Sequence, residues 1–130
     1  MKKTLSLLFT LLIAVLYLLF EKDIPQQEIA SQNHNEKYYQ TKMCDALSGD
    51  MEVVLEDKAR IDCLTTEYAI EVDFAKKWAE GIGQALYYAQ MSGKKPAVAL
   101  ISGANDTKFI NRLETVAKKY NIKVILIEEE

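Results

Sequence analysis

The chain has very few of the residues that hold transition metals. Its 130 residues include two cysteines and one histidine. The spacing of Cys44 and Cys63 fits no zinc motif, and no cluster of histidines accompanies them. The two thiols either form one intramolecular disulfide, which an oxidising compartment would favour, or are two small buried residues. The composition therefore argues against a Cys/His metal centre and leaves both interpretations of the cysteines open.

An excess of positive charge is also missing. After residue 20 the chain has 14 basic residues against 19 acidic ones, which gives a net charge of −5. Strong non-specific binding to nucleic acid usually comes with a basic patch, so this balance argues against such binding. It is compatible with a site where bound cations offset clustered carboxylates.

One stretch lacks charge altogether. Thr4–Phe20 is a run of 17 uncharged residues preceded by Lys2 and Lys3. As a helix it would span roughly 26 Å, slightly less than the ~30 Å hydrocarbon core of a bilayer. It is either a cleaved signal peptide or a retained anchor, and the bulky and then charged residues that end it favour the anchor. The two lysines predict export of the remainder across the cytoplasmic membrane, as a membrane-anchored, periplasmic or secreted protein.

The remainder divides into a tether and one domain. We assign residues 1–20 to the signal or anchor segment and residues 21–35, which are polar and contain His34, to the tether. Residues 36–130 alternate between helical and β-rich patterns. The predicted elements are a helix at 36–47, strands at 51–55, 60–64 and 68–74, a helix at 75–91, a strand at 97–101, a helix ending near 120 and a strand at 122–127.

These elements predict an α/β fold of order α-β-β-β-α-β-α-β, with a mixed sheet and helices on both faces. Tight polar turns join the first three strands, as in an antiparallel meander. The β-α-β order of the second half predicts parallel strands. On the helix at 75–91, the predicted buried stripe includes Trp78, Ile82, Ala85 and Leu86.

Three carboxylates are predicted to share one face of the meander. Glu71 and Asp73 alternate with apolar residues in the third strand, and Asp62 lies between Ile61 and Cys63 in the second. Because side chains alternate along a strand, the three acids point the same way if Ile61 and Cys63 face the core. Carboxylates so close together repel one another unless a positive group lies among them. Mg²⁺ or Mn²⁺, which prefer oxygen ligands, would be such a group.

The helix that follows adds a polar face. Lys77, Gly81, Gln84 and Tyr88 are spaced so that they lie on one side of it. Lys76 lies about 80° away from Gln84 around the axis, so Lys77 is the better aligned lysine. A lysine there can stabilise the charge of a phosphate or assist an attacking water.

The pattern of Asp62, eight intervening residues and Glu71-Val72-Asp73 resembles the PD-(D/E)xK nuclease superfamily. The run from Gln84 to Tyr88 is similar to the QxxxY motif of its RecB-like and lambda-exonuclease-like branch. The resemblance covers about residues 36–101 and implies a restriction-endonuclease-like core ordered as helix, three strands, helix, strand. The metal ligands that it implies are Asp62, Glu71, the backbone carbonyl of Val72 and, as an auxiliary acid, Glu36.

The remaining site residues follow from the same resemblance. Gln84 and Tyr88 would orient the substrate or the catalytic water. Asp73 stands where the motif has its lysine, which is a departure from the family pattern. Either the lysine has moved to the helix, with Lys77 the expected residue, or the site is degenerate.

We therefore expect a nuclease-like phosphodiesterase that depends on Mg²⁺ or Mn²⁺ and acts on nucleic acid outside the cytoplasm. The alternative is a catalytically inactive domain of the same fold, tethered at the membrane as a binding or assembly module. DNA and RNA, and cleavage within a strand or at its end, are equally compatible with these residues. The oligomeric state is left open by the sequence.

Overall fold

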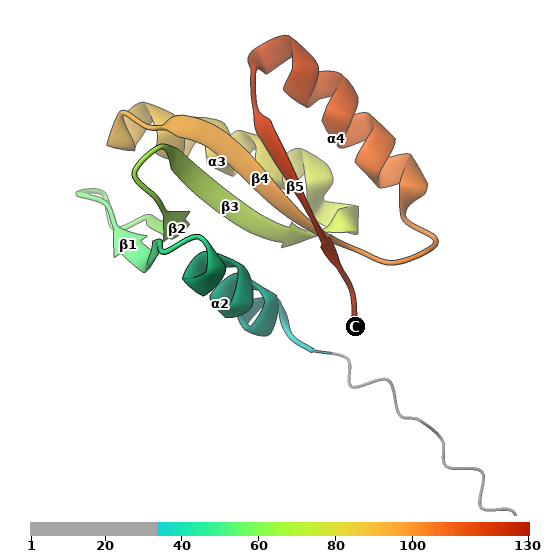
Figure 1. Cartoon of the computed structure of the whole chain (residues 1–130). Helices are drawn as coiled ribbons and strands as arrows, with labels where there is room; N and C mark the ends of the chain where they lie inside the picture. Colours follow the sequence, from blue (N-terminus) through green and yellow to red (C-terminus); the bar gives the residue numbers. More distant parts are fainter. Residues whose placement is uncertain (1–33) are drawn as a thin grey trace, which may run out of the picture. The chain divides into compact units, whose positions relative to one another are not determined.

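A computed structural model describes residues 34–130 of the chain (Figure 1). The predicted signal or anchor segment at 1–20 and most of the tether at 21–35 lie outside these residues. Among the helices of the described part, none is long and apolar enough to cross a membrane. The membrane role of residues 4–20 therefore stays a prediction.

Two helix ends of the described part are fixed by local chemistry. The Oδ1 atom of Asn35 accepts a hydrogen bond from the backbone N–H of Tyr38 at 3.0 Å and so caps the first helix. Gly93 ends the second long helix in the left-handed conformation, with φ of 68°, which glycine adopts without strain. The bounds are α2, Glu36–Ala46, the 3-10 turn η1, Ala75–Lys77, α3, Trp78–Ser92, and α4, Thr107–Tyr120.

In residues 34–130, five strands form one mixed sheet, in the spatial order β1-β2-β3-β4-β5. The first three pair antiparallel, and the last two continue the sheet parallel to β3. The predicted meander, the parallel second half and the mixed sheet are therefore confirmed. The bounds are β1, Asp50–Val54, β2, Arg60–Leu64, β3, Tyr68–Phe74, β4, Lys95–Ser102, and β5, Lys123–Glu128.

Helices cover both faces of the sheet, as predicted, with α2 on one face and α3 and α4 on the other (Figure 1). The central strand β4 serves both cores because its side chains alternate. Ala97, Ala99 and Ile101 pack on the α2 side, whereas Val98 and Leu100 pack against α3 and α4. All five are fully buried, which places the most apolar part of the sheet in its parallel half.

The predicted buried stripe of α3 is wrong at one position. Leu86 is 37% exposed, whereas Gly81, Ala85 and Tyr88 are buried. A Cβ atom at Gly81 would lie 3.4 Å from Val98, so the helix approaches β4 closely along this small-residue side. The packed stripe therefore centres on Ala85 and leaves Leu86 at its margin.

The β1–β2 hairpin bends at Glu52, whose φ of 55° is left-handed. The two strands remain paired on both sides of this bend. Met51 and Cys63 belong to the core under α2, whereas Val53 and Ile61 pack in a separate cluster on the other face of the sheet. The predicted common face for Ile61 and Cys63 is therefore wrong. The left-handed Glu52 interrupts the two-residue alternation of β1, so Met51 and Val53 reach different faces. Their partners in β2, Cys63 and Ile61, lie on the same faces as Met51 and Val53 respectively.

A disulfide joins Cys44 of α2 to Cys63 of β2, with their Cα atoms 5.6 Å apart. The structure thus decides between the two interpretations of the cysteines. Gly49 lies against the bridge, where a Cβ atom would come within 2.5 Å of the Cys63 sulfur. No other residue fits between helix and strand at this position without displacing the bridge.

Candidate functional site

A polar cleft of about 440 Å³ opens between α2, the β1–β3 meander and α3. We call it the acidic cleft. Every side chain predicted to act at the site lines it, so the structure confirms that these residues come together, while their roles stay predictions. They are Glu36 of α2, Asp62 of β2, Glu71 and Asp73 of β3, Lys77 of η1, and Gln84 and Tyr88 of α3. Val72, the remaining predicted ligand, turns its side chain into the core on the opposite face.

Asp62 is fixed where the β2–β3 ladder ends. Paired positions between these strands stop at Cys63↔Ile70 and Leu64↔Ala69. Next to them the Asp62 carboxylate accepts the backbone N–H of Val72 at 2.8 Å, so a side chain takes the hydrogen bond that a longer ladder would supply. Burial raises the pKa of Asp62, and this N–H acts in the opposite direction.

Glu71 is the most perturbed acid of the cleft. Its side chain is buried, and burial, followed by the charges of Asp62 and Asp73, raises the pKa of Glu71 to about 9. Its Oε2 atom finds no hydrogen-bond partner among the described residues. A buried carboxyl oxygen without a partner is costly, so this atom is where a cation or a hydrogen-bond donor would be stabilising.

Asp73 pairs with the lysine that follows it by four residues. Its Oδ1 atom lies 3.3 Å from Nζ of Lys77, and the aspartate is 3% exposed whereas the lysine side chain is half exposed. Burial raises the pKa of Asp73 to about 6, although Lys77 opposes that rise. A Cβ atom at Gly81 would lie 3.7 Å from the Asp73 carboxylate, so α3 leaves room for it. Asp73 is therefore poised to exchange a proton near neutral pH.

The other predicted residues lie around this centre. Burial raises the pKa of Glu36, whereas Lys77 lowers it. Gln84 donates to the hydroxyl of Tyr88 at 3.3 Å, which ties the first and last residues of the QxxxY-like motif together. The ring of Tyr88 packs on Ile61, which holds the phenol in place, and Tyr88 also lines the cleft.

Sequence reasoning missed a second set of residues. Gln40 is 3% exposed and donates both to Glu52 at 2.9 Å and to the backbone carbonyl of Asp62 at 2.8 Å. Arg60 lies 3.3 Å from Glu52 at the rim. The four-residue spacing from Glu36 to Gln40 places both on one side of α2 and was the available signal. No sequence pattern marks Glu52 as a cleft residue, because it reaches the cleft through a left-handed backbone that regular strand alternation does not predict.

The carboxylates of the acidic cleft decide whether a metal ion fits there. Within residues 34–130, no group of three or more His, Cys, Asp or Glu side chains is arranged to hold an ion. Mg²⁺ needs fewer protein ligands, because it keeps several waters and binds through one or two carboxylates and substrate phosphates. Asp62 and the partnerless oxygen of Glu71 fit that mode.

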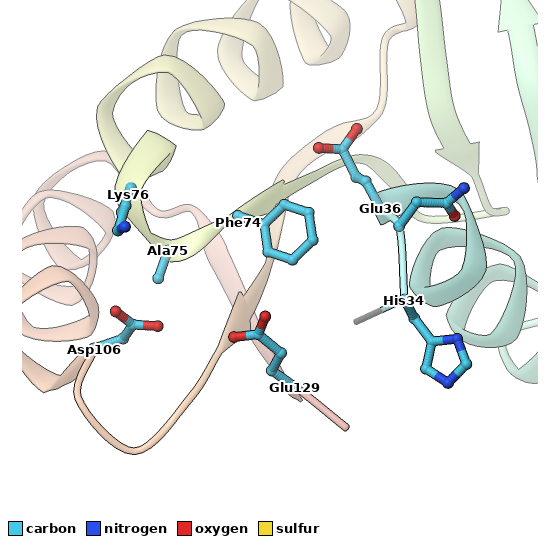
Figure 2. Close-up of a pocket in the computed structure, with 8 residues that line it drawn as sticks. His34, Glu36, Phe74, Ala75, Lys76, Asp106 and Glu129 are labelled. Carbon is cyan, nitrogen blue, oxygen red and sulfur yellow. The ribbon is translucent and has the colours of Figure 1, made fainter. Parts of the chain in front are cut away.

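A second hollow of about 440 Å³ lies beside the cleft and shares Glu36 with it (Figure 2). Phe74, Lys76, Asp106 and Glu129 surround it in the close-up. Lys76 therefore belongs to this hollow and Lys77 to the acidic cleft, as the helical spacing predicted. His34, assigned to the tether, borders the hollow too and stacks on Tyr38 with ring centroids 3.8 Å apart.

No family model matches the chain, and no solved structure matches it. Two curated relatives from Acanthamoeba polyphaga mimivirus, both named as KilA-N domain-containing proteins, are similar to it. One is 33% identical over 94 residues, covering 71% of this chain and 37% of the relative. The other is 26% identical over 108 residues, covering 83% of this chain and 29% of the relative.

The chain spans about a third of the length of these curated relatives.

Proposed function

We propose that the chain is a phosphodiesterase of the PD-(D/E)xK type, dependent on Mg²⁺ or Mn²⁺ and acting on nucleic acid. The acidic cleft carries this proposal, because it brings Asp62, Glu71 and Asp73 together beside Lys77. The order of elements from α2 to β4 is helix, three strands, helix, strand, which is the order that the resemblance implies. Perturbed carboxylates gathered in a cleft are typical of functional sites.

The metal would be held by Asp62 and Glu71, with the Val72 carbonyl and Glu36 as further expected ligands. The chemistry that Mg²⁺ supplies when bound is polarisation of a phosphoryl oxygen and a lower pKa of bound water. A cation beside Glu71 would also favour its ionised form over the protonated form that burial favours.

The protein's own side chains suit the remaining steps of hydrolysis. An O–P bond forms to the attacking water, which gives up a proton. The P–O bond to the leaving sugar oxygen breaks, and that oxygen takes up a proton from bulk water. Asp73, with its pKa raised to about 6, can accept the proton of the attacking water at neutral pH. Lys77, half exposed at the mouth of the cleft, can offset charge on a non-bridging phosphate oxygen. Gln84 and Tyr88 would orient the water or the substrate.

The proposal places the site outside the cytoplasm. The uncharged run at 4–20 supports export, and the Cys44–Cys63 disulfide is of the kind that forms in oxidising compartments. Fractionation of the full-length protein, with protease added to spheroplasts from which any outer barrier has been removed, tests this placement. Protection of residues 34–130 inside spheroplasts would contradict it.

A nuclease assay on the full-length chain tests the activity. We expect cleavage of single- or double-stranded DNA or RNA with Mg²⁺ or Mn²⁺ and its loss with EDTA. Asp62→Asn and Glu71→Gln should each abolish cleavage, whereas Glu67→Gln, which removes an exposed acid from the adjoining turn, should leave it intact. Cleavage that survives both cleft substitutions would refute the mechanism.

The alternative is a catalytically inactive binding module, and Asp73 favours it because it occupies the lysine position of the motif. Calorimetric titration with Mn²⁺ separates the two. Binding that Glu71→Gln removes supports the catalytic proposal. Absence of Glu71-dependent binding, together with no cleavage of any nucleic acid, supports the binding module.

A further inference from the structure

The two edges of the sheet differ in how they are protected. β1 is five residues long, begins with Asp50 and is turned at Glu52 by a left-handed φ of 55°. Shortness, acidic side chains and a local bend are devices that stop an edge strand from pairing with another chain. β5, six residues from Lys123 to Glu128, has charged side chains only at its two ends and no left-handed residue. Its central residues, Val124–Ile127, are all apolar, and Leu126 is 51% exposed.

No described strand pairs with the outer edge of β5. Among the described strands β5 pairs with β4 alone. Glu129 donates its N–H to the Ser102 carbonyl, so its backbone faces β4, and by alternation the backbones of Ile125 and Ile127 face β4 as well. The backbone groups of Val124, Leu126 and Glu128 therefore point away from the sheet.

We propose that β5 pairs antiparallel with β5 of a second copy of this chain, which makes a two-fold dimer with one continuous sheet. Antiparallel partners must both turn their backbone groups toward each other, so only residues of the same parity can stand opposite. A register centred on Leu126 satisfies this condition and places Leu126 against Leu126 of the second copy. Val124 then faces Glu128 of the second copy, for about six backbone hydrogen bonds in total.

Charge complementarity selects this register over its neighbours. With Leu126 on the two-fold axis, Lys123 stands opposite Glu129 of the second copy at both ends of the ladder. Ile125 stands opposite Ile127, and both lie on the α2 side of the sheet. Moving the axis to Ile125 sets Lys123 against Ile127, which loses the ion pair.

The pairing covers one strand edge and its flanking side chains, which is a small interface. We expect a dissociation constant in about the micromolar range. Attachment to a membrane, as proposed above, would raise the effective concentration of the chain.

Light scattering on the full-length chain in detergent tests the dimer. Leu126→Lys, at an exposed position, places two like charges on the two-fold axis and should raise the dissociation constant about tenfold or more. Leu86→Lys, at the exposed margin of α3, is the matched control and should leave it unchanged. Circular dichroism checks that both variants are folded. A chain that stays monomeric, or association that survives Leu126→Lys, would overturn the proposal.

Cross-linking tests the register independently. Under oxidation Leu126→Cys should form a covalent dimer, because hydrogen-bonded partners lie about 5.5 Å apart between Cα atoms, within reach of a disulfide. Val54→Cys, equally exposed on the other edge strand, should not. Exchanging charges by Lys123→Glu or Glu129→Lys should each weaken the dimer, and combining them should restore it. Equal cross-linking at both edges would refute the pairing.

Discussion

The two halves of the sheet divide stability and chemistry between them. In the parallel half, β3 and β4 pair over seven consecutive positions and β4 and β5 over six. In the antiparallel half, the β2–β3 ladder stops after two, and β1 bends at Glu52. The three central acids of the cleft, Asp62, Glu71 and Asp73, lie on β2 and β3 just beyond the last paired positions of that short ladder. Continuous pairing holds the fold, and interrupted pairing leaves room for buried charge.

The comparison shows how a small domain tolerates three acids in one place. Asp62 uses its carboxylate to replace a ladder hydrogen bond, while Glu71 and Asp73 sit on the strand that both halves share. The parallel half fixes β3 from its other side, so the acids cannot relax apart by moving the strand. Substitutions in each half should therefore affect stability and chemistry separately.

Truncating the parallel core should have the largest effect. Leu100 is fully buried between α3 and α4, so Leu100→Ala should lower the free energy of unfolding by about 2–5 kcal/mol. Leu86→Ala, on the exposed margin of α3, should change it by about 0.5 kcal/mol or less. Urea unfolding measures both. Equal losses in the two variants would contradict the assignment of stability to this half.

Opening the disulfide should come next. The bridge closes a loop of 19 residues that contains β1 and most of β2, so replacing both cysteines by alanine should cost about 2–4 kcal/mol. The loss should be accompanied by weaker protection of Asp62 and its neighbours from hydrogen exchange, with β4 unaffected. Loss of protection in β4 to the same degree would show that the two halves do not unfold separately.

Neutralising Glu71 should stabilise the metal-free protein. Folding raises the pKa of Glu71 from 4.5 to about 9, so the folded state holds a proton that the unfolded state releases. Stability should therefore fall as pH rises between these values, and Glu71→Gln should gain about 1–3 kcal/mol at pH 8 in EDTA.

Melting temperature across this pH range measures the effect. Glu71→Gln should flatten the slope above pH 6, where Asp73 has already ionised. Glu67→Gln should keep the slope, because Lys95 lowers the pKa of Glu67 and so keeps it ionised. A wild-type protein whose stability rises with pH would contradict the burial of a protonated Glu71.

Removing Lys77 should have the smallest effect on stability and a large one on activity. Its ion pair with Asp73 is half exposed on the lysine side, so Lys77→Met should cost less than about 1 kcal/mol. Cleavage should slow by about 100-fold. The pH optimum should move upward as well, because Lys77 lowers the pKa of Asp73. Lys76→Met, in the neighbouring hollow, is the control and should do neither.

The sequence carried enough information to predict the order of the elements and the acids at the centre of the cleft. Alternation gave the limits of β2 and β3 to the residue, and helical spacing separated Lys77 from Lys76. The sequence-based prediction failed where one residue departs from the regular strand backbone. No residue type next to Glu52 in the sequence predicts a left-handed conformation. The placement of its neighbours' β2 partners, Ile61 and Cys63, on different faces could therefore not be predicted.

Contacts between distant segments were equally hidden. Gln40 reaches the Asp62 carbonyl across 22 residues of sequence, a distance over which periodicity says nothing. The disulfide is similar, since two cysteines define one pairing without saying whether it forms. The shift of the α3 stripe away from Leu86 followed from the closeness of Gly81 to Val98, which only packing decides.

The left-handed backbone of Glu52 has one more consequence, which concerns growth beyond two copies. A sheet with two free edges can add chains without end and form fibres. Within the described sheet the bent β1 offers no straight template, so the proposed pairing would use only the straight edge of β5. Assembly would then close at the dimer, and the residue that lines the acidic cleft would also keep the protein from polymerising.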